Sequence, residues 1–74
     1  MKLKKLGNNE TEVEIGKYTI LFSYNTPVAY NEEGVGFFRT KKKWSSTTSK
    51  HINQWLGGAK AKEVEQGEIE ALLK

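Results

Sequence analysis

The chain has 74 residues, 36% hydrophobic and 28% charged, which is the composition of one folded domain and not of a disordered segment. Its formal net charge is +3, and it has no cysteine, which excludes disulfides, thiolate metal sites and a cysteine nucleophile. The apolar runs are too short to span a membrane, and Gly7-Asn8-Asn9 stands where a signal peptide needs an apolar stretch. We therefore expect a cytoplasmic protein.

The first half of the chain has the patterns of β-strands. A strand is expected over residues 2–6, and residues 11–15 alternate acidic with apolar side chains before the β-branched and aromatic run 18–24, which predicts a hairpin. Asn25-Thr26-Pro27 is expected to break that strand, because proline has no N–H for a ladder. Further strands are expected over 28–30 and 35–40. Short turns join all of them, which predicts an antiparallel meander.

The period then changes from that of a strand to that of a helix. Thr48, Ile52, Trp55 and Leu56 fall on one side of a helix expected over 47–56, with hydroxyl side chains before it as caps and Gly57 after it as a stop. A second short helix is expected over 66–73. Glu65 is its expected cap, and Val64 and Ile69 have the spacing of a hydrophobic staple.

Together these elements predict an α+β fold with a single domain over residues 1–74. The expected architecture is an antiparallel β-meander of three to five strands followed by one or two short α-helices packed on one face. We expect Trp55 and Ile52 to lie between helix and sheet, against Phe22 or Ile20.

No set of residues predicts an enzyme, a cofactor or a metal site. His51 is the sole histidine, and no acid lies within ten residues of the serines near it, so a triad would need a distant carboxylate to which nothing points. One histidine without cysteine is a poor metal set. The neighbouring carboxylates Glu12 and Glu14 alternate with apolar residues, which a solvated strand face explains.

Charge is distributed unevenly, and this points to a binding segment. Between Gly34 and Lys62 there are seven basic residues and no acid, whereas the rest of the chain holds all nine acids. The segment joins a strand to a helix N-terminus, which attracts anions, and its tryptophan could stack on a base. The candidate residues for binding an anion or a partner are Arg39, Lys41, Lys42, Lys43, Trp44, Ser46, Thr47, Ser49, Lys50, His51, Asn53 and Gln54. The alternative is a solvated loop whose hydroxyls only cap the helix.

The same stretch resembles a family of small uncharacterised proteins associated with bacteriophage and prophage genes. The resemblance is carried by Leu21-Phe22-Ser23-Tyr24-Asn25-Thr26-Pro27-Val28-Ala29 and by Trp44-Ser45-Ser46-Thr47-Thr48-Ser49-Lys50-His51-Ile52-Asn53-Gln54-Trp55-Leu56. It covers about half of the chain, residues 18–56, and implies a phage setting, hence the host cytoplasm, but no mechanism.

Three functions follow as hypotheses. The first is a phage accessory protein that binds a host protein stoichiometrically, such as a defence factor, and inhibits or modulates it. The second is binding of nucleic acid, a nucleotide or another phosphorylated ligand through residues 39–51. The third is a minor structural protein of the virion. The sequence does not decide the oligomeric state.

Overall fold

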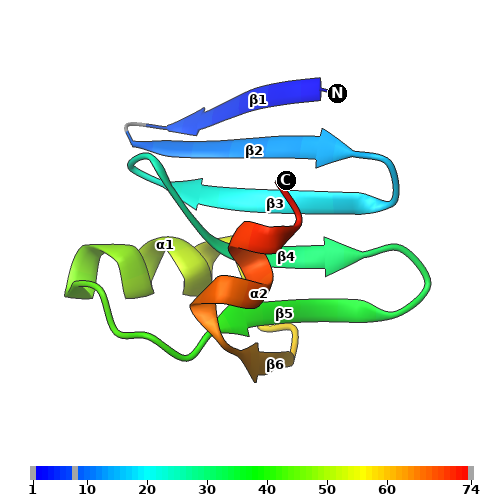
Figure 1. Ribbon diagram of the computed structural model, residues 1–74. Coiled ribbons are helices and arrows are strands. Elements are labelled where there is room, and N and C mark those ends of the chain that lie inside the picture. The colour runs from blue at the N-terminus through cyan, green and yellow to red at the C-terminus, as the bar shows by residue number, and fades with distance from the viewer. Residues whose placement is uncertain (1, 8, 74) are drawn as a thin grey trace.

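The computed structural model of the chain describes residues 2–7 and 9–73 and confirms the α+β class (Figure 1). It has more strands than the three to five expected. The elements are β1 (Lys2–Gly7), β2 (Glu10–Ile15), β3 (Tyr18–Ser23), β4 (Thr26–Glu32), β5 (Gly36–Thr40), α1 (Ser46–Leu56), β6 (Ala61–Val64) and α2 (Gln66–Ala71). Both helices of the described part are too short to span a bilayer.

The six strands form one sheet whose spatial order follows the chain, from β1 at one edge to β6 at the other (Figure 1). Strands β1 to β5 are an antiparallel meander, as expected. Strand β6 pairs in parallel with β5, so the sheet is mixed and the purely antiparallel prediction is wrong. The parallel pairing is possible because α1 lies between the two strands and returns the chain to the starting end of β5.

Strand β4 is longer than expected because Pro27 lies within it. The register shifts between Leu21 and Phe22, which pair with Ala29 and Pro27, so that Val28 is the extra residue of a bulge. Proline is tolerated at a bulge because the regular ladder is interrupted there. The strand before it does end as expected, at Ser23, but Thr26 and Pro27 belong to the next strand and not to the break.

One face of the sheet is covered by α1. Leu21 and Val28 pack there against Ile52 and Leu56, while Trp55 lies half-buried at the border of this cluster. Ile52 thus lies between the layers as expected. The sheet residue opposite it is Leu21, not Phe22 or Ile20, which belong to the other face.

The second face is covered by α2, so the prediction that the helices share one face is wrong. Ile20 and Tyr30 pack there against Ile69, and Tyr30 stacks on Phe38 with ring centroids 4.7 Å apart. Successive strand residues point to opposite sides, so Ile20 and Leu21, both fully buried, require a cover on each face.

The helix ends follow the predicted signals. Ser45 is the N-cap of α1, its Oγ accepting the Thr48 N–H at 3.1 Å, and Gly57 ends the helix in the left-handed conformation with φ 59°. Glu65 is the N-cap of α2. Val64 and Ile69 pack in one hydrophobic cluster, as the two residues of a hydrophobic staple do. Helix α2 ends at Ala71, two residues before the expected end.

Candidate functional site

The sequence-predicted residues are distributed over four parts of the molecule. Arg39 lies on β5 and donates to Asn53 Oδ1 on one flank of α1 at 3.3 Å, the flank where half-buried Ser49 also lies. His51 lies on the other flank, toward β2 and β3. The remaining helical residues, Ser46, Thr47, Lys50 and Gln54, are exposed. The loop residues Lys41, Lys42, Lys43 and Trp44 precede the helix.

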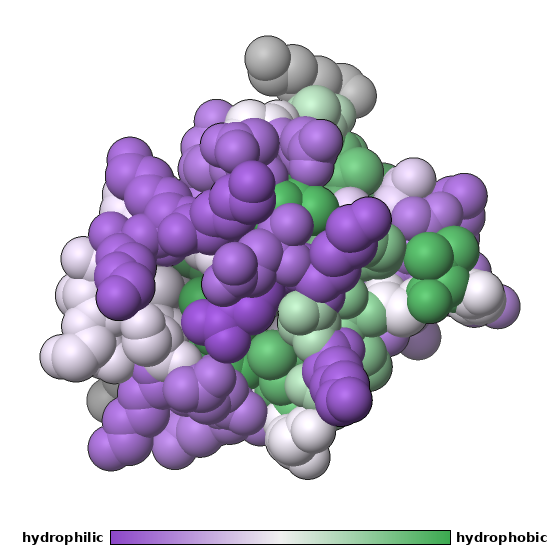
Figure 2. Space-filling view, turned by 90° about the horizontal axis from the view of Figure 1, so that it is seen from below, coloured by the Kyte–Doolittle hydropathy of each residue, from purple (hydrophilic) through white to green (hydrophobic). Residues whose placement is uncertain are grey.

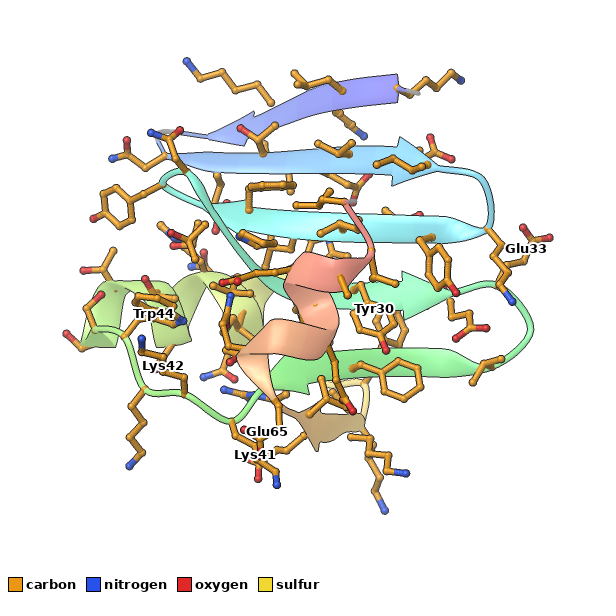
Figure 3. The ribbon with its side chains drawn as sticks, viewed as in Figure 1. Tyr30, Glu33, Lys41, Lys42, Trp44 and Glu65 are labelled. Atoms are coloured by element: carbon orange, nitrogen blue, oxygen red, sulfur yellow. The ribbon has the colours of Figure 1, made fainter. Side chains whose placement is uncertain are left out.

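Lys41, Lys42 and Lys43 form an exposed basic loop between β5 and α1. The loop is anchored at its start, where Lys41 N–H donates to Val64 O at 2.9 Å and Lys42 N–H donates to Thr40 Oγ1 at 3.1 Å. Lys41 Nζ lies 3.2 Å from Glu65 Oε1, an exposed ion pair of little energy, while Lys42 extends toward Trp44 (Figure 3). The backbone of the basic loop is thus held at its base, while its three lysine side chains are exposed.

Beside the basic loop lies an open aromatic hollow of about 200 Å³. It is lined by Ser23, Tyr24, Thr26, Val28, Trp44, Ser45 and Thr48. Two aromatic side chains stand at its rim, Tyr24 with 49% and Trp44 with 40% of its surface exposed. Lys42 Nζ lies 4.1 Å from the centroid of the Trp44 ring, which places a positive charge at the same wall.

Tyr24 has an unusual backbone conformation for a bulky residue. Its φ is 59°, in the left-handed region, and its N–H donates to Asn9 O at 2.6 Å. This conformation costs an aromatic residue of order 1 kcal/mol, and such strain is concentrated at functional sites. It turns the Tyr24 ring toward His51, with ring centroids 6.1 Å apart.

Below the aromatic hollow, Ser23, Ser45, Thr48 and His51 form a polar network that joins α1 to β3. Ser23 Oγ lies 3.1 Å from Thr48 Oγ1 and 2.9 Å from His51 Nδ1, and Ser45 Oγ donates to Thr48 Oγ1 at 3.2 Å. Ser23 is 2% exposed and Thr48 4% exposed. Their hydroxyls are therefore paired with each other, as buried polar groups must be.

The network extends to the distant carboxylate that the sequence did not indicate. Glu10 Oε1 lies 3.8 Å from His51 Nε2 and has no hydrogen-bond partner in the described part of the chain. Serine, histidine and glutamate thus stand in one line, but the serine meets Nδ1 and the glutamate faces Nε2, the reverse of the hydrolase triad. Ser23 is also only 2% exposed and shares its hydroxyl with Thr48, which ties it into the contact between β3 and α1. This geometry fits the fastening of a helix to a sheet.

A second contact of the same kind lies one helical turn further along α1. Trp55 Nε1 donates to Glu12 Oε1 at 2.9 Å, and its ring meets Phe37 edge-on at 5.5 Å. His51 and Trp55 are four residues apart and therefore lie on the same side of the helix. Glu10 and Glu12 are two residues apart and therefore lie on the same face of β2, so each of the two helix residues faces one glutamate. Glu12 is therefore a hydrogen-bond acceptor under α1, and the explanation of a wholly solvated strand face is wrong for it.

The electrostatic field around α1 is positive at its N-terminal end. The first turn of α1 contains no acid that would offset the helix dipole, and Lys50 adds a positive charge in the next turn. Lys60 and Lys62 are exposed on and before β6, along the edge next to the basic loop. Seen from this β6 side, the surface is largely hydrophilic (Figure 2).

Sequence reasoning missed the residues that complete the site. Ser23 ends β3, Tyr24 lies in the turn that follows, Thr26 begins β4, and Glu10 comes from β2. The alternation of side chains along β3 indicates one of them, because Ser23 is two residues from Leu21 and therefore lies on the same face of the sheet, the face that α1 covers. No three histidine, aspartate or glutamate side chains gather as a metal site within residues 2–7 and 9–73.

Comparison with known proteins gives a family but no characterised relative. Neither the curated proteins nor the solved structures contain a match. A family model described as a family of unknown function (DUF8033) matches residues 1–71, which is nearly the whole chain. The chain therefore belongs to the DUF8033 family of unknown function.

Proposed function

We propose that this protein binds single-stranded nucleic acid without catalysing a reaction, taking a base at the aromatic hollow and phosphates at the basic loop. The observation that carries the proposal is the position of Trp44. Its ring forms a wall of the hollow and lies next to Lys42, at the end of the basic loop. Aromatic rings beside lysines are the usual means by which proteins hold single strands irrespective of sequence.

The dimensions of the aromatic hollow support a planar ligand. About 200 Å³ of open space lies between two partly exposed aromatic side chains, Tyr24 and Trp44, over a floor that includes Thr48 and Val28. A flat ring can contact both aromatic side chains there, and stacking on one aromatic residue contributes about 1–3 kcal/mol per base.

The charges support an anionic chain next to that ring. Of the basic loop, only Lys41 has a carboxylate partner among the described residues, and that ion pair is exposed. Lys43 is exposed, and Lys42, whose ammonium lies over the Trp44 ring, can meet a phosphate beside that ring. The acid-free first turn of α1 adds to the attraction.

Fluorescence anisotropy with a labelled oligothymidylate tests this proposal. We compare the Lys41→Ala/Lys42→Ala/Lys43→Ala variant with a matched control, Lys2→Ala/Lys4→Ala/Lys5→Ala, which removes the same charge from β1 at the opposite edge. Each phosphate contact contributes about 0.7 to the slope of log affinity against log salt, so the loop variant should lower that slope by about 2. The control should keep the wild-type slope.

Equal slopes in the two triple variants would attribute binding to net charge alone and would contradict the proposed site. A duplex bound as tightly as the single strand would contradict the part played by stacking. Binding of a mononucleotide alone would restrict the ligand to a small phosphorylated molecule.

Stoichiometric binding of a host protein is a second candidate function, which the open edge strand β1 favours. All six residues of β1 are exposed, including Leu3 with 71% of its surface. The resemblance of residues 18–56 to phage-associated proteins supports a phage origin, within which either function would act in the host cytoplasm. Affinity purification from bacterial lysate tests this candidate, and repeated recovery of no specific protein counts against it.

A further inference from the structure

We propose that β1 binds an extended peptide segment in which acidic and apolar residues alternate, as a seventh strand of the sheet. This proposal names the partner chemistry for the second candidate function and does not depend on nucleic-acid binding. It rests on three observations: an edge with free backbone groups, lysines that alternate with an exposed leucine, and an apolar hollow beside that leucine.

The first observation is the edge itself. Strand β1 is the first in the sheet order and pairs only with β2 within the described part of the chain (Figure 1). The backbone N–H and C=O groups on its other side therefore point outward, and such a row is a template for another strand.

The second observation is the alternation of charge along β1. Lys2 pairs with Glu14 and Lys4 with Glu12, and these side chains lie on the face that α1 covers. Each lysine has an acidic neighbour on the β2 side only. A strand added on the free side would place its own acids next to the same lysines, where opposite charges across a strand pair are stabilising.

The third observation is the exposed Leu3 on the other face of β1, which it shares with Lys5. Leu3 pairs with Val13, which pairs with Ile20, and this row ends in the open at Leu3. An apolar hollow of about 220 Å³ lies beside it, with Phe22 among its lining residues. An apolar side chain on an added strand would continue the row and cover Leu3.

The charges decide between a second copy of this chain and an acidic partner. Pairing β1 with β1 of another copy would bring Lys2, Lys4 and Lys5 of both chains together, and like charges across strands are destabilising. Edge lysines thus oppose self-association, and they favour a strand of opposite charge. The sequence of β2, in which Glu12 and Glu14 flank Val13, already pairs with β1 and shows the matching alternation.

The test is an NMR titration of the ¹⁵N-labelled protein with a synthetic peptide that repeats Thr-Glu-Val-Glu-Ile. We expect amide shifts confined to β1 and its neighbours, and slowed hydrogen exchange of β1 amides. The Lys2→Glu/Lys4→Glu variant should weaken binding by about tenfold or more, as charge reversal at a contact does. A peptide with lysine in place of both glutamates should restore binding to that variant and bind the wild type poorly.

The matched control is Lys41→Glu/Lys42→Glu, which reverses the same number of charges on the basic loop and should leave peptide affinity unchanged. Leu3→Ser should weaken binding without unfolding the chain, because this side chain is exposed.

The proposal is overturned by equal binding of acidic and lysine peptides, by shifts centred on the basic loop, by self-association through β1, or by no shift at millimolar peptide. Oligonucleotide shifts on β1 would instead assign this edge to nucleic acid. A host protein that is still captured by the Lys2→Glu/Lys4→Glu variant would retain the second candidate function and exclude β1 as its site.

Discussion

The polar network predicts a measurable loss of stability when Ser23 is changed to alanine. Ser23 Oγ bonds both Thr48 Oγ1 and His51 Nδ1, and the alanine variant removes both bonds. Thr48 keeps Ser45 as a partner, whereas the half-buried His51 loses its partner at Nδ1. A hydrogen bond contributes about 0.5–1.5 kcal/mol and an unpaired buried group costs about 1–3 kcal/mol, so we expect the free energy of unfolding to fall by about 1–3 kcal/mol.

Urea unfolding followed by tryptophan fluorescence measures this loss, because Trp44 and Trp55 lie before and within α1. Ser46→Ala is the control: Ser46 is exposed at the start of the same helix, and its removal should change stability by less than about 0.5 kcal/mol. A Ser23→Ala variant as stable as that control would refute the fastening role of the network. Loss of an enzymatic activity in Ser23→Ala at unchanged stability would refute the non-catalytic interpretation.

Three further perturbations test other parts of the account. Ile69 is fully buried and is the residue by which α2 docks on the sheet, so Ile69→Ala should lower the free energy of unfolding in urea by about 2–5 kcal/mol. Leu73→Ala, at a site 41% exposed, should lower it little. Equal effects of the two variants would contradict the packing of α2 on the second face of the sheet. Burial raises the pKa of Tyr30, and the charges of nearby glutamates raise it further. The protonated Tyr30 hydroxyl therefore contributes its full stabilisation below about pH 10, and this stabilisation is lost as pH rises through the raised pKa. Wild type should therefore lose stability relative to Tyr30→Phe in alkaline urea titrations, and parallel curves would exclude this linkage. Trp55→Phe removes the bond to Glu12 and should cost about 1–2 kcal/mol, and a double-mutant cycle with Glu12→Ala should show coupling between the two side chains.

Local chemistry determines the elements that were predictable from the sequence. Helix α1 has a capping serine, an apolar stripe and a terminal glycine, all within a dozen residues, so its bounds follow from neighbours along the chain. The β2–β3 hairpin is equally local, since residues 15 and 18 of its two strands pair directly across the turn. These signals do not depend on the rest of the fold.

Strand β6 and the placement of α2 were not predictable in the same way. Ala61–Val64 has only four residues, two of them charged, and it becomes a strand because β5 offers it a parallel edge. The side on which α2 packs is decided by where β6 ends, which no local pattern encodes. The consecutive buried residues Ile20 and Leu21 do indicate that both faces of β3 are covered.

The candidate site was predictable only in its basic and helical part. Lys41 to Trp44 are consecutive in sequence, so their exposure at one loop follows from charge and the start of the helix. The aromatic hollow needs Tyr24, which comes from a turn twenty residues earlier, and the polar network joins Ser23 to Thr48 across 25 residues. Glu12 and Trp55 are 43 residues apart. Tertiary pairing alone brings these groups together.

The most direct test of nucleic-acid binding uses the two tryptophans separately. In Trp55→Phe the remaining tryptophan is Trp44, at the aromatic hollow, whereas in Trp44→Phe it is Trp55, which lies against Phe37. Titration with oligothymidylate should quench the fluorescence of Trp55→Phe, because a base stacks on Trp44, and should leave that of Trp44→Phe unchanged. No quenching in Trp55→Phe, or equal quenching in both variants, would contradict the proposed site.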